Sequence, residues 1–218
     1  MINIKIFGQG KPLVLFHGWG FDSNIWLPFI QADLEPLACQ LYLVDLPGFG
    51  RTPNMSWSAF RDELLRVLPS KFMLLGWSLG GLFATRLCIE APSRVLKLIN
   101  VTSSPHFVSA DGWVGIDRQV FMNFYQQFKT NPQKTREEFI RNQFKTDLNL
   151  DLCLANDIDL QGLERGLDLL LSWDLRQDLY TVEQPVLFLF GKLDAIVPRR
   201  LMLILKEYFP QFSYVMLP

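Results

Sequence analysis

The chain has 218 residues, of which 49% are hydrophobic and 20% are charged, a balance typical of one well-buried globular domain. Disordered and fibrous proteins are therefore excluded. The formal net charge is −1, so no overall field favours nucleic acid or an anionic membrane as a partner. No apolar stretch is long enough to span a membrane, and Gly, Lys and Pro interrupt the N-terminus before a signal sequence could form. We expect a cytoplasmic protein that works as a monomer.

The three cysteines, Cys39, Cys88 and Cys153, are widely spaced and form no CxxC pair. We expect free thiols in a reducing compartment. No zinc or calcium pattern occurs, and the Gly8-Gln9-Gly10 stretch lacks the third glycine of a dinucleotide fingerprint. The sequence therefore predicts no metal and no cofactor.

Six short apolar runs are predicted to be β-strands, and helix-length segments separate the early ones. Runs that are apolar on both faces are typical of the interior of a parallel sheet. Alternating strands and helices predict βαβ crossovers and an open α/β sheet. The predicted strands are Leu13–Phe16, Leu41–Val44, Phe72–Leu75, Val95–Val101, Val186–Phe190 and Tyr214–Leu217. The predicted early helices are Ser23–Leu34, Ser56–Leu68 and Leu79–Glu90.

The alternation stops between about residues 107 and 178, where the pattern is aromatic and helical, as in FMNFYQQF and LERGLDLLL. No buried strand is evident there. We interpret residues 107–178 as a helical cap inserted into the sheet domain, whose two parts would be residues 1–106 and 179–218.

A candidate nucleophile lies in the stretch MLLGWSLGGLFA at residues 73–84. Residues 76–80 match the pattern G-x-S-x-G, with a predicted strand before Ser78 and a predicted helix after it, as a nucleophile elbow requires. Glycines flank the serine because the turn is strained and side chains would clash with strand and helix. The alternative is a purely structural Gly/Ser turn.

A second part of the site is the sequence HGWG at residues 17–20, directly after a predicted strand. Acyl transfer needs two N–H donors aimed at the developing oxyanion. We expect one from the backbone of Leu79, the residue after the nucleophile, and the other from Trp19. His17 could instead be the general base, but its position favours a histidine bonded to neighbouring backbone.

The candidate acid is Asp194, in FGKLDAIVP at residues 190–198, where a predicted strand ends and a glycine turns the chain. Open α/β sheets place their sites at this carboxyl edge. A carboxylate there would orient a histidine and stabilise its charged form. Two alternatives stay open: Asp194 could cap a helix ahead of Pro198, and Asp174 could be the acid, although a turn role suits Asp174 better.

Together these motifs resemble the α/β-hydrolase family and, more narrowly, the pimeloyl-[acyl-carrier protein] methyl ester esterases of bacterial biotin synthesis. The resemblance spans nearly the whole chain. It is carried by LFHGWGFDSNIW, LVDLPGFGRT, LLGWSLGGL, SSPHF, GWVGID, FIRNQF, WDLRQDL and LFGKLDAIVPRR. GWSLGG and DLPGFGR occur across many hydrolases, so the narrower likeness depends on HGWG, the SSP…GW…GI series and DLRQ together.

The resemblance implies an α/β-hydrolase fold and hydrolysis of the methyl ester at the end of a pimeloyl chain carried by acyl carrier protein. Its nucleophile falls on Ser78 and its acid on Asp194. The substrate contacts it implies are Trp19, Ser78, Leu79, Phe139, Ile140, Arg141, Asn142 and Gln143. The cap residues expected to attract the acidic carrier are Arg118, Arg136, Arg141 and Lys145. Solvated helix faces are the alternative for these basic residues.

One member of the expected triad is missing from the sequence. The family's histidine follows the acid, in a loop after the last strand. The chain contains only His17 and His106, and neither is a good candidate, although His106 could be a substitute base. We expect a truncated chain whose catalytic histidine lies beyond Pro218; a mature form without the base is the other explanation. A broad short-chain carboxylesterase and a non-catalytic module that binds an acyl ligand or carrier protein are the alternative functions.

Overall fold

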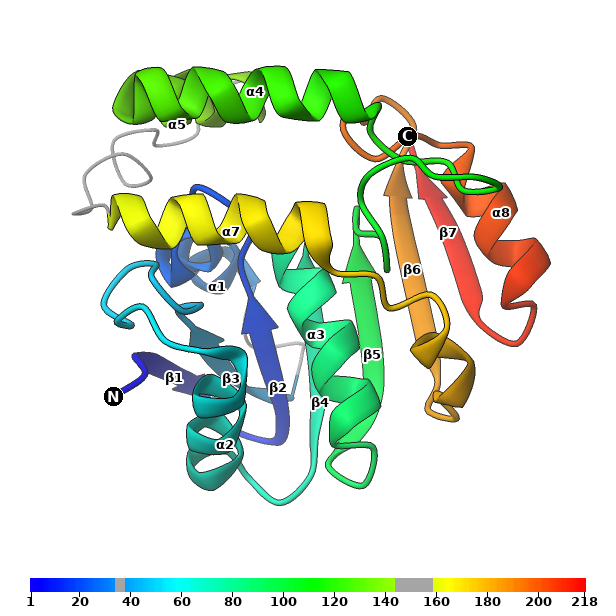
Figure 1. Ribbon diagram of the computed structural model, residues 1–218. Helices are drawn as coiled ribbons and strands as arrows, with labels where there is room; N and C mark the ends of the chain where they lie inside the picture. The colour runs from blue at the N-terminus through cyan, green and yellow to red at the C-terminus, as the bar shows by residue number, and fades with distance from the viewer. Residues whose placement is uncertain (34–37, 144–158) are drawn as a thin grey trace.

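A seven-stranded β-sheet forms the centre of the computed structural model, which describes residues 1–33, 38–143 and 159–218 (Figure 1). The strands follow the order β1-β3-β2-β4-β5-β6-β7 across the sheet. Their bounds are β1 (Ile4–Gly8), β2 (Lys11–Phe16), β3 (Cys39–Val44), β4 (Phe72–Trp77), β5 (Val95–Val101), β6 (Val186–Gly191) and β7 (Ser213–Leu217). The predicted α/β architecture is confirmed, and all six predicted strands are present.

Strand β1 pairs antiparallel with β3, and the other described strand pairs are parallel. The parallel strands therefore end at one edge of the sheet, which brings together the residues that follow β2, β4, β5 and β6. The sequence pattern misses β1 because this strand lies at the sheet edge. Strand β1 contains the charged residue Lys5, and its Ile6 is 55% exposed. It therefore lacks the apolar character of the inner strands.

Helices cover both faces of the sheet (Figure 1). On one face, Ile30 of α1 packs with Leu15 and Leu43 in a small apolar cluster. On the other, α2, α3 and α8 contribute to the main core, where Leu64 and Leu205 are fully buried. The helices outside the β5–β6 connection are α1 (Leu27–Asp33), α2 (Trp57–Val67), α3 (Leu79–Glu90), α8 (Leu201–Tyr208) and the 3-10 helix η1 (Ser23–Trp26), whereas the 3-10 helix η3 (Asp178–Thr181) lies within that connection, just before β6.

Among the described residues between β5 and β6, three α-helices are present, and we call them the cap helices: α4 (Arg118–Thr130), α5 (Pro132–Gln143) and α7 (Leu160–Ser172). They extend across the carboxyl edge of the sheet, above the strand ends (Figure 1). The predicted helical character of this stretch is confirmed, whereas its boundaries as a separate cap stay a prediction. Cys153 and Lys145 lie outside the described residues. Within the described ranges, no helix has the length and hydrophobicity that a membrane crossing requires.

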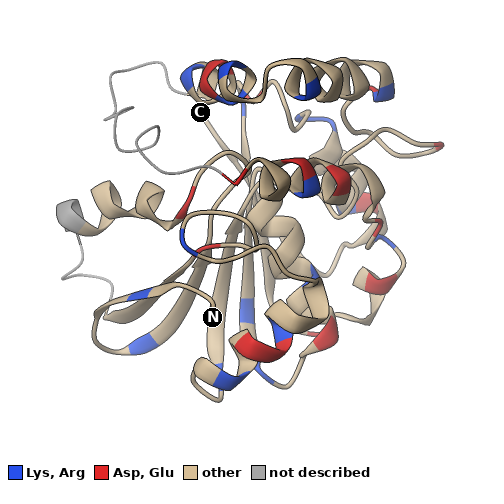
Figure 2. Ribbon diagram, turned by 60° about the vertical axis from the view of Figure 1, so that its left-hand side comes forward, with Lys and Arg blue, Asp and Glu red and all other residues tan. Residues whose placement is uncertain are grey.

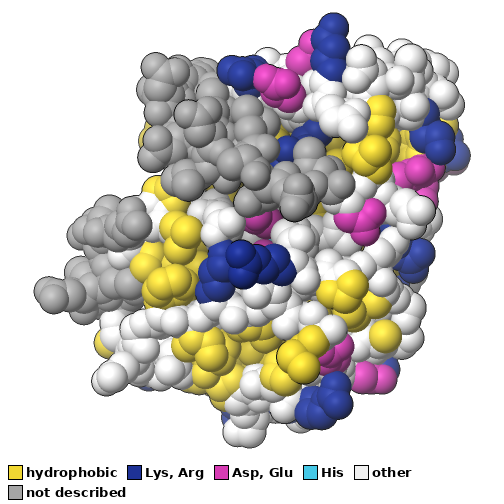
Figure 3. Space-filling view, turned by 90° about the vertical axis from the view of Figure 1, so that its left-hand side faces the viewer, with side chains coloured by type: hydrophobic (Ala, Val, Ile, Leu, Met, Phe, Trp, Pro, Cys, Tyr) yellow, Lys and Arg dark blue, Asp and Glu magenta, His cyan; other side chains and the backbone are white. Residues whose placement is uncertain are grey.

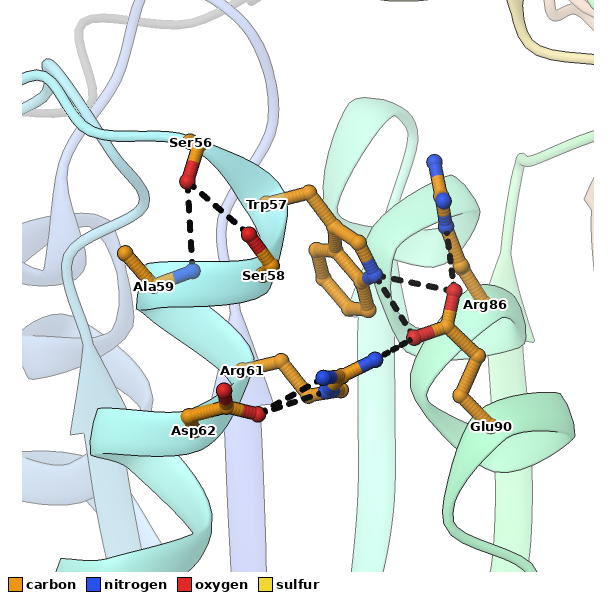
Figure 4. A network of polar contacts seen from close by, with 8 residues as sticks. All are labelled: Ser56, Trp57, Ser58, Ala59, Arg61, Asp62, Arg86 and Glu90. Carbon is orange, nitrogen blue, oxygen red and sulfur yellow. Dashed lines mark hydrogen bonds and ion pairs between the residues drawn. The ribbon is translucent and has the colours of Figure 1, made fainter.

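Glu90 joins α2 and α3 at the end of α3 that is remote from the carboxyl edge (Figure 4). Its carboxylate accepts hydrogen bonds from Trp57 Nε1 at 2.9 Å, Arg86 Nε at 2.8 Å and Arg61 Nη1 at 2.5 Å. Burial alone would raise the pKa of Glu90, but these donors outweigh it and the pKa lies below its usual value. The Arg86 guanidinium also lies 4.3 Å from the ring centre of Trp173, directly after α7. One charged cluster thus connects the C-terminal half of α3 to α2 and to Trp173, the residue that follows the last cap helix.

Candidate active site

Ser78 occupies the sharp turn between β4 and α3, with φ of 54° and ψ of −118°. A serine rarely adopts a positive φ, and such strain costs about 1–3 kcal/mol. Two hydrogen bonds fix the turn. The Ser78 N–H donates to the Val101 carbonyl at 2.9 Å, and the Ser103 hydroxyl donates to the Ser78 carbonyl at 2.8 Å. This strained and firmly held geometry is that of a nucleophile elbow.

The glycines beside Ser78 are required by close backbone contacts. A Cβ at Gly76 would lie 2.3 Å from the Gly80 carbonyl oxygen. A Cβ at Gly80 would lie 2.5 Å from the His17 carbonyl oxygen. Backbone atoms cannot move aside as a flexible side chain can, so any larger residue at either position would force β4, α3 and the loop after β2 apart.

Trp19 lies in the loop of residues 17–20, which we call the HGWG loop, and its side chain is 2% exposed beneath the cap helices. The indole Nε1 donates to the Leu163 carbonyl of α7 at 2.8 Å. The ring packs edge-on against Phe124 and Phe128 of α4 and Phe139 of α5, with centroids 5.0 to 5.8 Å apart. All three cap helices therefore contact the residue predicted to supply one oxyanion donor.

Leu79, the other predicted donor, is the first residue of α3, and its side chain is fully buried. The first N–H groups of a helix have no acceptor within the helix, so the Leu79 N–H is available to a negative charge that develops beside Ser78. The helix N-terminus favours such a charge. This arrangement suits an oxyanion site.

His17 is not placed to act as a base. Its side chain is fully buried, with Nδ1 2.8 Å from the Gly18 carbonyl oxygen and Nε2 accepting from the Leu46 N–H at 3.0 Å. A neutral imidazole with its proton on Nδ1 satisfies both contacts and keeps no free lone pair for Ser78. Burial lowers the pKa of His17 below its usual value, although the charge of Asp45 opposes this. On the one face of the molecule drawn in Figure 3, no histidine is visible among the described residues.

Asp194 follows β6 and lines the same cleft as Ser78. Its Oδ1 atom accepts hydrogen bonds from the N–H groups of Ile196 at 2.8 Å and Val197 at 2.9 Å. These bonds fix the carboxylate, and Oδ2 keeps no protein partner among the described residues. The alternative that Asp194 caps a helix is not found, because α8 begins at Leu201 with Arg200 at its N-cap; Asp194 instead holds the turn after β6, and its Oδ2 can orient an imidazole.

His106 and Asp174 lie at the base of the cap and do not line the cleft. His106 Nδ1 is 3.2 Å from the Trp173 carbonyl oxygen. Asp174 forms an ion pair with Arg176 at 2.6 Å and also accepts from the Arg176 N–H. The His106 contact joins the chain entering the cap to the chain leaving it, and the Asp174 contacts hold a turn within the chain that leaves it; both roles are structural.

A cleft partly open to solvent brings five of the predicted site residues together, namely Trp19, Ser78, Phe139, Gln143 and Asp194. Its walls come from the HGWG loop, the residues after β4, β5 and β6, and helix α5. The lining combines aromatic and aliphatic side chains with the polar groups of Ser78, Thr102, Gln143 and Asp194, which suits an acyl chain that carries an ester. In the described ranges, no three His, Cys, Asp or Glu side chains are grouped to hold a metal ion. The lining residues are Gly18, Trp19, Phe21, Trp77, Ser78, Thr102, Phe139, Gln143, Asp194, Ile196 and Val197.

The five α5 residues that are predicted to contact the substrate lie on different sides of the helix. Phe139 and Gln143, four residues apart, line the cleft. Ile140 is fully buried among the packed side chains, and Arg141 and Asn142 are exposed. The structure therefore brings two of these five residues to the cleft.

The four basic residues predicted to dock a carrier differ in their surroundings. Arg118 is exposed at the start of α4, Arg141 is exposed and pairs with Glu137 at 2.8 Å, and Lys145 lies outside the described residues. Arg136 requires a correction, because it is 5% exposed and its Nε donates to the Gly20 carbonyl at 2.8 Å. A side chain buried in this way cannot reach a partner's surface. Basic and acidic residues are interspersed along the cap helices (Figure 2).

Thr102 lines the cleft and was not anticipated from the sequence. It follows β5 with φ of 40°, a value that a β-branched residue adopts only under constraint, and its N–H donates to the Leu189 carbonyl at 2.8 Å. Its position directly after a predicted strand is the one signal that could have identified it.

Comparison with known proteins agrees with this geometry. A family model described as alpha/beta hydrolase fold matches residues 11–218. A pimeloyl-[acyl-carrier protein] methyl ester esterase of Legionella pneumophila (strain Corby) is 49% identical over 215 residues, which make up 99% of this chain and 89% of that protein. The chain belongs to this family of α/β-hydrolase esterases. A relative of the same name from Aeromonas hydrophila is 36% identical, and the match covers 99% of the present chain and 90% of the Aeromonas protein.

Solved structures share the fold of the esterase. The esterase EaEST from Exiguobacterium antarcticum superposes with a TM-score of 0.88 at 21% identity, covering 100% of this chain and 87% of its own. A bromoperoxidase from Bacillus anthracis gives a TM-score of 0.84 at 23% identity, covering 99% and 86%. At these identities the likeness concerns the fold alone.

Proposed function

We propose that this carboxylic ester hydrolase removes the methyl group from pimeloyl-[acyl-carrier protein] methyl ester, releasing methanol, as a step of biotin synthesis. The observation that carries the chemistry is the strained turn at Ser78, which shares one cleft with Trp19 and Asp194. The names of relatives that are 36% and 49% identical over 99% of the chain support the substrate.

In the proposed reaction, Ser78 Oγ attacks the ester carbonyl, and its proton passes to a base. The N–H groups of Leu79 and Trp19 stabilise the negative oxygen of the tetrahedral intermediate. The intermediate collapses to an acyl-enzyme and methanol, and water then attacks the acyl-enzyme to release the free acid. Asp194 holds the imidazole of the base in one orientation through its available Oδ2 atom.

The base itself stays a prediction, namely a histidine after Pro218. His17 spends both ring nitrogens on backbone contacts, and His106 contacts the Trp173 carbonyl outside the cleft. Without a base, Ser78 is a weak nucleophile, and only binding and oxyanion stabilisation contribute to the rate.

A serine-directed fluorophosphonate probe tests the nucleophile. We expect labelling at Ser78 in the protein extended at its C-terminus and much slower labelling of the 218-residue chain. Ser78→Ala should abolish labelling in both forms. Its thermal unfolding should match that of the same form with Ser78, which shows that the variant is folded. If neither form is labelled, the protein is a binding module with a hydrolase fold and the esterase mechanism is wrong.

The acyl carrier protein is proposed as the partner that presents the substrate. Two exposed basic residues on the cap helices, Arg118 and Arg141, support an acidic partner, although Arg141 is already paired with Glu137. Exposed ion pairs of this kind contribute about 0–1 kcal/mol, so Arg141 can exchange Glu137 for a carboxylate of the carrier at little cost.

A further inference from the structure

We propose that Arg136 is a positioning residue for the reaction: it holds the HGWG loop in the conformation that aims the Trp19 N–H at the oxyanion. This inference rests on the proposed esterase function. Its basis is the hydrogen bond from Arg136 Nε to the Gly20 carbonyl oxygen, 2.8 Å long and linking residues that are 116 positions apart in the chain.

The burial of Arg136 points to a specific role. Removing a guanidinium from water costs several kcal/mol unless hydrogen bonds and charges compensate. Helix α5 has solvent-facing positions that tolerate a basic residue freely, as Lys134 and Arg141 show with side chains 68% and 54% exposed. Arg136 instead lies 5% exposed against the loop. Its position therefore reflects contacts inside the protein, among them the bond to the Gly20 carbonyl, and not solubility or surface charge.

The contact with the loop includes packing as well as the hydrogen bond. Gly20 has φ of +85°, in the left-handed region that favours glycine. A Cβ built there would lie 3.8 Å from Cγ of Arg136 and 3.6 Å from Cδ1 of Phe139, at ordinary van der Waals distances. The stem of Arg136 thus covers Gly20 while its Nε binds the carbonyl of the same residue.

Fixing Gly20 also fixes Trp19, because the two are the central residues of one turn. The Phe21 N–H donates to the Gly18 carbonyl at 3.4 Å and closes that turn. Trp19 is anchored a second time, through its indole, to the Leu163 carbonyl of α7. Helix α7 therefore restrains Trp19, and helix α5 restrains the next residue, Gly20. A shift of about 1 Å in such a donor can cost about 100-fold in rate.

The same helix carries contacts to the acyl chain. Phe139 and Gln143 line the cleft one and two turns beyond Arg136. Any movement of α5 would therefore displace the predicted acyl contacts and the predicted oxyanion donor together. A substrate seated under α5 stabilises the arrangement in which the oxyanion donor is correctly aimed.

The test uses the C-terminally extended protein with Arg136→Met and Arg136→Leu, which both remove the bond to Gly20, and with Arg136→Lys, which keeps a charged donor. With a small methyl ester as substrate, we expect kcat to fall about 10- to 100-fold in Met and Leu while KM changes less than about threefold. Lys should recover most of kcat. A trifluoromethyl ketone, which forms an oxyanion adduct with Ser78, should lose affinity in parallel with kcat.

Lys134→Met, on the exposed side of the same helix, is the matched control and should keep wild-type kcat. Having two bond-removing variants keeps the test informative if one of them does not fold. Wild-type kcat in a folded Met or Leu variant would overturn the proposal, as would a loss confined to KM. An extended protein with the native Arg136 that neither turns over esters nor reacts with a fluorophosphonate would instead overturn the esterase function on which the proposal rests.

Discussion

The indole of Trp19 donates a hydrogen bond to the main-chain carbonyl of Leu163, 2.8 Å away, and so ties the loop after β2 to helix α7. Gly166, about one turn further along α7, faces the same indole. A Cβ at Gly166 would lie 2.8 Å from Cδ1 of Trp19 and 3.3 Å from Cδ2 of Leu79. One helix of the cap thus forms a wall against both residues that are predicted to bind the oxyanion.

Replacing Gly166 with alanine should therefore impair catalysis more than folding. The added methyl group presses on Trp19 and Leu79, and such overpacking costs about 1–3 kcal/mol of folding free energy. We expect kcat for a small methyl ester to fall at least about tenfold, because both oxyanion donors would shift. Urea unfolding and steady-state kinetics measure the two effects separately.

Gly162→Ala is the matched control on the same helix. Its Cβ would meet the Gly48 carbonyl oxygen at 2.1 Å, so it should destabilise the protein by at least as much, and its nearest contacts are with the Gly48 backbone instead of Trp19 or Leu79. Equal losses of kcat in the two variants, measured on folded protein, would contradict a specific link between α7 and the oxyanion residues.

The strain at Ser78 predicts a stability difference between two inactive variants. Ser78→Ala keeps a Cβ at φ of 54°, whereas Ser78→Gly removes it. Relief of strain worth about 1–3 kcal/mol should outweigh the entropy of about 0.4–1 kcal/mol that glycine adds to the unfolded chain. We expect the glycine variant to melt about 2–4 °C above the alanine variant. A lower melting temperature for glycine would show that the turn is not strained.

The burial of His17 predicts a loss of stability on mild acidification. Burial depresses the pKa of His17 in the folded protein, so between the two pKa values the unfolded chain binds the proton and the folded protein does not. The free energy of unfolding should keep its full value above about pH 6.5, the pKa of histidine in the unfolded chain. It should fall as the pH drops toward the folded-state pKa, by at most about 1.4 kcal/mol per pH unit.

His17→Gln should be less stable than wild type at pH 7, because it disturbs the contacts to Gly18 and Leu46. Its own stability should depend less on pH between 7 and 5, since this proton-linked contribution is gone. Denaturant titrations at several pH values provide the comparison. Parallel pH profiles for the two proteins would mean that His17 is not the group responsible.

Charge reversal at the two exposed cap arginines should separate carrier binding from chemistry. With Arg118→Glu combined with Arg141→Glu, we expect KM for the carrier-bound ester to rise about tenfold, from two exposed contacts worth up to about 1 kcal/mol each. Turnover of a small methyl ester should stay near wild type, because neither side chain lines the cleft. The wild-type KM for the carrier substrate should also rise with added salt. Equal effects on both substrates would contradict a docking role.

Local motifs made much of the active site predictable. The patterns around Ser78 and Asp194 could be located because strand–turn–helix sequences and glycines leave a strong signal, and parallel strands bring their carboxyl ends to one edge. The proximity of Trp19 to Ser78 follows from the same topology, since β2 and β4 are neighbours in the sheet. The structure adds that these residues share one cleft with Phe139 and Gln143.

The placements that the sequence does not predict depend on features that no short pattern contains. Arg136 was placed among the docking residues because composition cannot distinguish a buried from an exposed arginine on a polar helix. The division of Phe139 to Gln143 into cleft, core and surface positions depends on how α5 is rotated about its axis. The positive φ of Thr102 arises from the contacts that hold the end of β5, including the bond from its N–H to Leu189 in β6.

The mass of the carrier-bound acyl group tests the central claim most directly. Pimeloyl-[acyl-carrier protein] methyl ester is incubated with the C-terminally extended protein and with its Ser78→Ala variant, and the intact carrier is followed by mass spectrometry. We predict that the extended protein shifts the carrier by the mass of one methylene, as methyl ester becomes acid, while Ser78→Ala leaves the mass unchanged. An unchanged carrier with the extended protein, or an equal shift with Ser78→Ala, would contradict the account.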